Sequence, residues 1–110
     1  MLFELCLLPL QSEANSSVET ITDAVRLIHS AGLPYQVNAF GTCVEGEWDQ
    51  VMAIAKQGLE MARKRSTHVV LIIKVEDDGS TASKITGNVN AVAAMLARSP
   101  APQGEDQPFS

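Results

Sequence analysis

The feature that most restricts the fold is residues 69–75, an apolar run rich in β-branched side chains and interrupted only by Lys74. Its composition predicts a strand with apolar side chains on both faces. Alternation places Val69, Leu71, Ile73 and Val75 on one face, and His68, Val70, Ile72 and Lys74 on the other. Both faces need partners, so the chain must build a sheet with further elements packed against it.

A second strand is expected over residues 2–8, ending at Pro9, because proline cannot donate a hydrogen bond to a sheet. Three of its side chains share the face expected to meet the core: Phe3, Leu5 and Leu7. Glu4 lies on the other face. We expect Glu4 to be solvated, paired or directed at a ligand, since burial of an unpaired carboxylate is strongly unfavourable.

Three amphipathic helices are predicted. The first begins with the capping-box pattern of Ser16 and Glu19 and ends before Gly32; its apolar stripe is Val18, Ile21, Val25 and Ile28. The second covers residues 47–65, with an acidic first turn, a basic last turn and an apolar stripe of Trp48, Val51, Ala55, Leu59 and Ala62. The third covers residues 84–98, is capped by Ser83 and has the stripe Ile85, Val89, Val92 and Leu96.

Between the first two helices, two short strands are expected to form an antiparallel hairpin. The first covers residues 34–40 and the second residues 43–45, with Gly41 and Thr42 between them. The first of these strands alternates an apolar face containing Tyr35 with a polar face containing Asn38.

Composition limits the class of protein. The 110 residues predict one domain, which we place at residues 1–98, followed by a disordered, proline-containing tail over 99–110. The formal charge of −5 argues against nucleic acid as a partner. No segment resembles a membrane span or targeting signal, and Cys6 and Cys43 lack metal-type spacing, so we expect reduced thiols in a cytoplasmic protein.

The order of elements is strand, helix, strand, strand, helix, strand, with an additional C-terminal helix. This is the ferredoxin-like βαββαβ arrangement, an α+β fold in which two helices cover one face of a four-stranded antiparallel sheet. The other face is expected to carry a mixture of apolar and polar side chains, which a monomer would rarely leave exposed. Either the third helix or another copy of the chain should cover this face, and we expect a homo-oligomer.

The sequence also resembles the small thiamine- or hydroxymethylpyrimidine-binding proteins with a ferredoxin-like fold. The matching residues are Glu4, Pro9, Ser30-Ala31-Gly32-Leu33, Tyr35, Gly41-Thr42, Glu45-Gly46, Trp48-Asp49, Val51-Met52 and Ile73-Lys74. The resemblance implies a non-enzymatic binder of thiamine or of its pyrimidine moiety, without a cofactor, assembled as dimers or tetramers. The chain departs from the family at His68 and Asp78, where arginine is usual.

Six residues are candidates for the ligand site: Glu4, Tyr35, Asn38, Thr42, Glu45 and Trp48. Carboxylates can pair with a cationic thiazolium, amides and hydroxyls can bind the pyrimidine edge, and an aromatic ring can stack. Each also has a structural alternative. Thr42 could be a turn residue, Glu45 a capping or solvated acid, Trp48 a core residue, and Asn38 an ordinary polar group of the open face.

Two other classes of function compete with small-molecule binding. Ferredoxin-like dimers include isomerases and monooxygenases, for which His68 would be the candidate base. The sequence shows no Ser-His-Asp order, no metal-ligand cluster and no phosphate loop, which favours a protein that is not an enzyme. A purely oligomeric or regulatory module is the third possibility.

Overall fold

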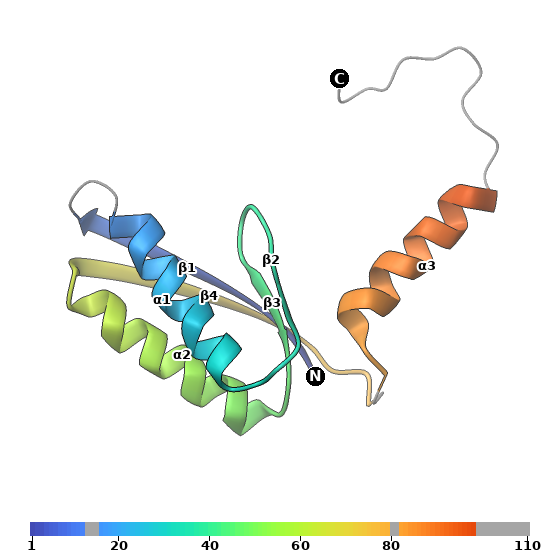
Figure 1. Ribbon diagram of the computed structural model, residues 1–110, viewed down its shortest axis with the longest axis horizontal. Coiled ribbons are helices and arrows are strands. Elements are labelled where there is room, and N and C mark those ends of the chain that lie inside the picture. The colour runs from blue at the N-terminus through green and yellow to red at the C-terminus, as the bar shows by residue number, and fades with distance from the viewer. Residues whose placement is uncertain (13–15, 80–81, 99–110) are drawn as a thin grey trace, which may run out of the picture.

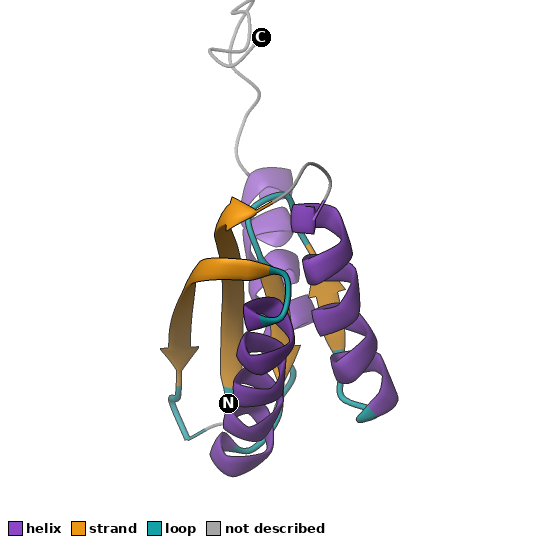
Figure 2. Ribbon diagram, turned by 90° about the vertical axis from the view of Figure 1, so that its left-hand side faces the viewer, coloured by secondary structure: helices purple, strands orange, loops and turns teal. Residues whose placement is uncertain are grey.

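The computed structural model describes residues 1–12, 16–79 and 82–98, and the expected tail at 99–110 lies outside this part. In chain order the elements are β1 (Leu2–Ser12), α1 (Ser16–Ser30), β2 (Tyr35–Val37), β3 (Thr42–Glu45), α2 (Trp48–Arg63), β4 (Ser66–Glu76) and α3 (Lys84–Arg98). The four strands form one antiparallel sheet in the order β2-β3-β1-β4. Helices α1 and α2 lie side by side on one face, as Figures 1 and 2 show. The predicted ferredoxin-like fold is confirmed.

The hydrophobic core lies between these two helices and the sheet. Its fully buried members come from β1, α1, β3 and α2: Phe3, Ile28, Val44, Val51 and Ile54. The alternation predicted for β1 is confirmed, because Phe3 and Leu7 are buried and Leu5 packs against the core. At the C-terminal end of α2, Arg65 joins the two helices through an ion pair with Asp23 of α1 (2.5 Å).

The strand β1 does not end at Pro9, as expected, but continues to Ser12. The reason is that β3 pairs with β1 only as far as Leu5, so the later part of β1 is a sheet edge on that side. The Leu5 carbonyl points toward the hairpin, since a Cβ at Gly41 would lie 3.0 Å from it. Main-chain groups alternate sides along a strand, so Pro9, four residues after Leu5, faces the same side. The sheet has no partner strand there, so the missing N–H of Pro9 leaves no hydrogen bond unmade.

The hairpin is confirmed, but its first strand is shorter than the expected 34–40. Strand β2 ends at Val37, and the Asn38 amide donates to the Gly41 carbonyl (2.8 Å), which closes a turn. This turn places Phe40 at the tip of the hairpin, where its side chain is 89% exposed.

The apolar stripes of α1 and α2 differ in part from the prediction. Val18 is exposed, whereas Thr20 is buried. In α2, Trp48 is 49% exposed and does not belong to the buried core, while Ile54 and Gly58 are buried. A pattern of large apolar residues does not detect buried positions that are occupied by small residues.

Helix α3 has the predicted bounds but does not cover the sheet. None of its residues is buried, and it contacts the rest of the fold mainly at β3. Figure 1 shows it extending away from the two-layer body. Its apolar side chains are consequently exposed: Val89, Val92, Met95 and Leu96. On the sheet face opposite α1 and α2, Ile72 is 46% exposed.

Candidate functional site

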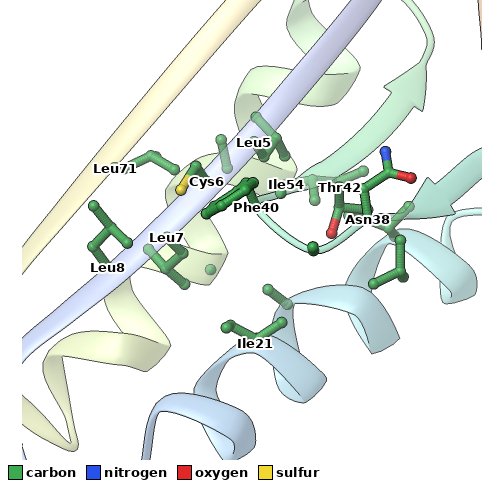
Figure 3. A pocket seen from close by; sticks show the side chains of 17 residues that line it. Leu5, Cys6, Leu7, Leu8, Ile21, Asn38, Phe40, Thr42, Ile54 and Leu71 are labelled. Carbon is green, nitrogen blue, oxygen red and sulfur yellow. The ribbon is translucent and has the colours of Figure 1, made fainter. Parts of the chain in front are cut away.

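A cavity of about 180 Å³ lies where β3 stops and β1 continues. Strand β3 pairs with β1 only as far as Leu5, so the edge of β1 that faces the hairpin has no partner strand from Cys6 to Leu8. Helices α1 and α2 close the cavity from the opposite layer, and the hairpin tip borders its mouth (Figure 3). The cavity is therefore a direct result of the unequal lengths of β1 and β3.

The lining of the cavity is almost entirely apolar. Strand β1 and helices α1 and α2 contribute Leu5, Cys6, Leu7, Leu8, Ile21, Ala24, Ile28, Ile54, Ala55 and Gly58. The hairpin and β4 contribute Val37, Asn38, Ala39, Phe40, Gly41, Thr42 and Leu71. Among the described residues no charged side chain lines the cavity, so a group that enters must be able to leave water without an ionic partner from them.

Thr42 supplies the hydroxyl of this cavity. The residue is 6% exposed, and its pairing with Leu5 across β3 and β1 turns its side chain toward the helices. Figure 3 shows its oxygen directed toward the space between the sheet and α1. Within the described part of the chain, no hydrogen bond to this hydroxyl is found. A polar group in such surroundings is stabilised when a ligand or water pairs with it.

The main chain of β1 offers a second polar feature. In a strand, the main-chain groups of every second residue point to the same side. The Leu5 carbonyl points toward the hairpin, so the N–H and C=O of Leu7 also point to this side of β1, where the pairing with β3 has already ended. The cavity is lined by residues 5–8 of this strand. One donor and one acceptor therefore lie next to each other on the unpaired side of β1.

Asn38 lies at the mouth, but its amide is turned outward and already has partners (Figure 3). Its Nδ2 donates to the Cys43 sulfur (3.5 Å), and its Oδ1 accepts from Gln36 (3.2 Å). These contacts belong to the open face of the sheet. Asn38 thus connects the cavity mouth with the polar group around Cys43.

Glu4 projects from the face opposite Thr42. It pairs with Cys43 on β3 and with Lys74 on β4 in the sheet register, and its carboxylate lies 3.5 Å from the Lys74 ammonium. Burial raises the pKa of the Cys43 thiol, the nearby Glu4 charge raises it further, and the Asn38 hydrogen bond lowers it. The net pKa is above the ordinary value, so this thiol stays protonated and is a poor nucleophile.

Glu45 is occupied as the cap of α3. Its carboxylate accepts hydrogen bonds from the Ser83 hydroxyl (2.6 Å) and from the main-chain amides of Lys84 (3.0 Å) and Ile85 (3.2 Å). Burial raises the pKa of Glu45, but these three bonds outweigh it and leave the pKa below its ordinary value. The sequence predicted that the Ser83 side chain would cap α3. The Glu45 carboxylate on β3 accepts the hydrogen bonds from the first amides of the helix instead, which corrects that prediction.

The two aromatic candidates lie away from the cavity. The Tyr35 hydroxyl is 3.0 Å from His29 Nδ1, and the two rings meet edge to face. The Trp48 ring packs on Phe3 at a centroid distance of 6.0 Å. Of the six candidate residues, only Thr42 and Asn38 line the cavity. Thr42 pairs with Leu5 and Cys43 pairs with Glu4, so Thr42 and Glu4 lie on opposite faces of the sheet and the six candidates do not form one site.

The two departures from the family pattern also have places in the structure. His68 is an exposed residue of β4, and Asp78 pairs with the Lys84 ammonium at the start of α3 (2.5 Å). The Asp78 hydrogen bond raises the pKa of Lys84. Asp78 therefore helps to fix the start of α3.

Phe40 and Gly58 are among the cavity residues that were not singled out from the sequence. Phe40 was expected inside a strand, and Gly58 was hidden within an amphipathic helix. The signal for Phe40 was the adjacent Gly41, which favours a turn; the signal for Gly58 was a glycine in the middle of a helix. In the described ranges, no helix is long and apolar enough to cross a membrane, and no three potential metal ligands cluster.

Comparison with known proteins assigns this arrangement to a family. The family described as "Thiamine-binding protein" matches residues 3–93. A UPF0045 protein of Mycobacterium bovis is 33% identical over 81 residues, which cover 73% of this chain and 79% of the relative. A UPF0045 protein of Eremothecium gossypii is 32% identical over 56 residues, or 51% of this chain and 53% of the relative.

Solved structures share the fold. A hypothetical protein of Methanocaldococcus jannascii superposes with a TM-score of 0.74 at 22% identity, covering 84% of this chain and 94% of its own. A putative thiamine biosynthesis/salvage protein of Thermotoga maritima gives a TM-score of 0.70 at 21% identity, covering 82% and 96%.

Proposed function

The chain belongs to the thiamine-binding protein family, and from this premise we propose that it is a non-catalytic binder of a pyrimidine ring, either free hydroxymethylpyrimidine or the corresponding part of thiamine. The observation that carries the proposal is the position of Thr42, a residue only 6% exposed, whose hydroxyl lines a cavity of about 180 Å³ and has no hydrogen-bond partner among the described residues. The name of the Thermotoga maritima protein, which refers to thiamine biosynthesis or salvage, points the same way.

The size of the cavity supports a single ring as its occupant. An apolar protein cavity of about 150 Å³ can hold benzene. A cavity of about 180 Å³ therefore has room for one substituted six-membered ring. In thiamine, the pyrimidine would enter and the cationic thiazolium would stay at the mouth, because the lining offers no carboxylate to compensate its desolvation.

The polar groups support an aminopyrimidine in particular. Its ring edge places a hydrogen-bond donor beside an acceptor, and the Leu7 main chain offers the complementary pair at the free edge of β1. The Thr42 hydroxyl can donate or accept. Asn38 lies at the mouth, where it could contact a substituent of the ring. The exposed Phe40 ring could stack on the ligand from the hairpin tip.

A non-catalytic role fits the chemistry of the described residues. The Cys43 thiol has a raised pKa, and His29 is engaged with Tyr35. Neither is arranged with a base or orienting acid as nucleophilic catalysis requires. The two free cysteines, Cys6 and Cys43, are in keeping with a reducing compartment, and we place the protein in the cytoplasm.

We further propose that the protein is a homo-oligomer, a dimer or tetramer, in which another copy covers the open sheet face. Helix α3 leaves that face uncovered, and Ile72 and Leu8 are exposed there. The exposed apolar stripe of α3 adds a second surface that a monomer would rarely present to water. A self-complementary pairing of such surfaces is the commonest arrangement in small homo-oligomers.

The location of the site can be tested by titrating the labelled protein with hydroxymethylpyrimidine and following the amide resonances. We expect the largest shifts at Leu7, Thr42 and Gly58, which surround the cavity. Shifts confined to the Glu4, Cys43 and Lys74 region would instead place the ligand on the open face and contradict the proposed site.

A further inference from the structure

Gly58 is a glycine in the interior of a helix that has no structural need for one. It lies in the middle of α2 and is buried against α1. A glycine at such a position destabilises a helix by about 1 kcal/mol relative to alanine. Some compensating reason for its presence is therefore expected.

The backbone does not supply that reason. The glycines with positive φ in the described part of the chain are Gly32 and Gly79, and Gly58 has ordinary helical geometry. Any residue can adopt this conformation.

Packing does not supply it either. A Cβ built at Gly58 meets one neighbouring atom, the Ala24 Cβ at 3.8 Å, which is an ordinary van der Waals contact. By contrast, a Cβ at Gly41 would lie 3.0 Å from the Leu5 carbonyl, and one at Gly46 would lie 3.1 Å from Val51. At those two positions an added Cβ would be in tighter than ordinary contact, whereas at Gly58 it would meet only this one ordinary contact.

The open space beside Gly58 is the cavity. Gly58 lines it together with Ala55, one turn earlier on α2, and Ala24 on α1. These small residues are part of the wall contributed by the two helices, which also includes Ile21, Ile28 and Ile54. A methyl group at position 58 would therefore reduce the space available to a ring without disturbing the fold.

We propose that Gly58 is a specificity-determining position, where the missing side chain provides the depth that a substituted six-membered ring requires. The inference rests on the proposed function for the identity of the ring, although the volume argument holds for any flat, uncharged ring. The proposal predicts opposite changes in stability and in ligand affinity. Alanine at position 58 should stabilise the protein and weaken its binding of the ring.

The test compares Gly58→Ala with wild type by thermal unfolding and by calorimetric titration with hydroxymethylpyrimidine. We expect the melting temperature to rise by roughly 4–8 °C and the affinity to fall by about tenfold or more. Gly87→Ala is the matched control, because Gly87 lies in α3, has open space around it and does not line the cavity. Its affinity should equal that of wild type.

Each alternative result has a definite meaning. A lower melting temperature for Gly58→Ala would show that packing requires the glycine and would overturn the inference, as would unchanged affinity for the pyrimidine. If wild type does not bind the pyrimidine at all, the proposed function fails, and benzene followed by amide shifts replaces it as the probe. Benzene binding that is weakened in Gly58→Ala would then support the role of Gly58; equal or absent binding in both proteins would overturn it.

Discussion

Thr42 lies directly opposite Leu5 across strands β3 and β1, so its hydroxyl faces the helices and enters an uncharged cavity. One residue further along β3, Cys43 lies opposite Glu4 on the other side of the sheet. This single step in register separates a polar but neutral site from an ionic surface. Under the proposed function, this arrangement would favour the neutral pyrimidine ring over the thiazolium cation.

The first prediction concerns Phe40. Its ring is 89% exposed, so Phe40→Ala should leave the melting temperature almost unchanged. If the ring stacks on the ligand, its loss should weaken pyrimidine binding by roughly 2- to 12-fold, because aromatic pairs contribute about 0.5–1.5 kcal/mol. Phe40→Tyr keeps the ring and should retain the affinity. Equal calorimetric affinities for wild type and Phe40→Ala would exclude stacking at the hairpin tip.

The second prediction concerns the cap that Glu45 provides for α3. Burial raises the pKa of Glu45, but the bonds from Ser83, Lys84 and Ile85 lower it to below its ordinary value of 4.5. A lowered folded-state pKa stabilises the cap at pH values above the unfolded pKa, and this contribution is lost as the pH falls through the folded pKa.

Acidification through the lowered pKa of Glu45, which lies below its ordinary value of 4.5, should therefore release the start of α3. We expect the amide resonances of Lys84 and Ile85 to titrate together with the Glu45 carboxyl, and Glu45→Ala to cost the helix about 1 kcal/mol at neutral pH. Glu45→Gln removes the titrating group and serves as the control. An identical titration of the two amides in this variant would rule out Glu45 as the cause.

The third prediction concerns assembly through the open sheet face. Ile72 is 46% exposed there, opposite Cys6 in the register of β1 and β4. Light scattering at micromolar concentration should show a dimer or tetramer for wild type and a smaller species for Ile72→Lys, since a buried unpaired charge opposes association. Val18→Lys, on the outer side of α1, should assemble as wild type does. A monomeric wild type, or an unchanged assembly in Ile72→Lys, would contradict this role of the face.

Much of the fold could be predicted because the apolar patterns are strong. The continuous run of β4, the alternation of β1 and the helical periodicity of the segments between them indicate the order of elements, which fits the ferredoxin-like arrangement. The differences arise where tertiary contacts decide. Pro9 is accepted within β1 because the neighbouring strand has already ended, and Trp48 is half exposed although it lies at the start of the predicted stripe.

The candidate site could be predicted only in part. The residue types at Thr42 and Asn38 indicated hydrogen bonding, and both line the cavity. The remaining lining depends on how far β3 extends and on which helix positions are small, and neither property has a periodic pattern. Glu45 shows the same limit, because its partners at positions 83–85 lie about forty residues away in the chain.

The central claim is that the cavity binds a pyrimidine ring through the Thr42 hydroxyl. Calorimetric titration with hydroxymethylpyrimidine should therefore be performed on wild type, Thr42→Val and Glu4→Gln. Thr42→Val preserves the shape of the side chain and removes only the hydroxyl, so the fold should be as stable as before and the affinity about 2- to 12-fold weaker. Glu4→Gln should bind as wild type does. Absence of binding by wild type, or a greater loss with Glu4→Gln than with Thr42→Val, would contradict the account.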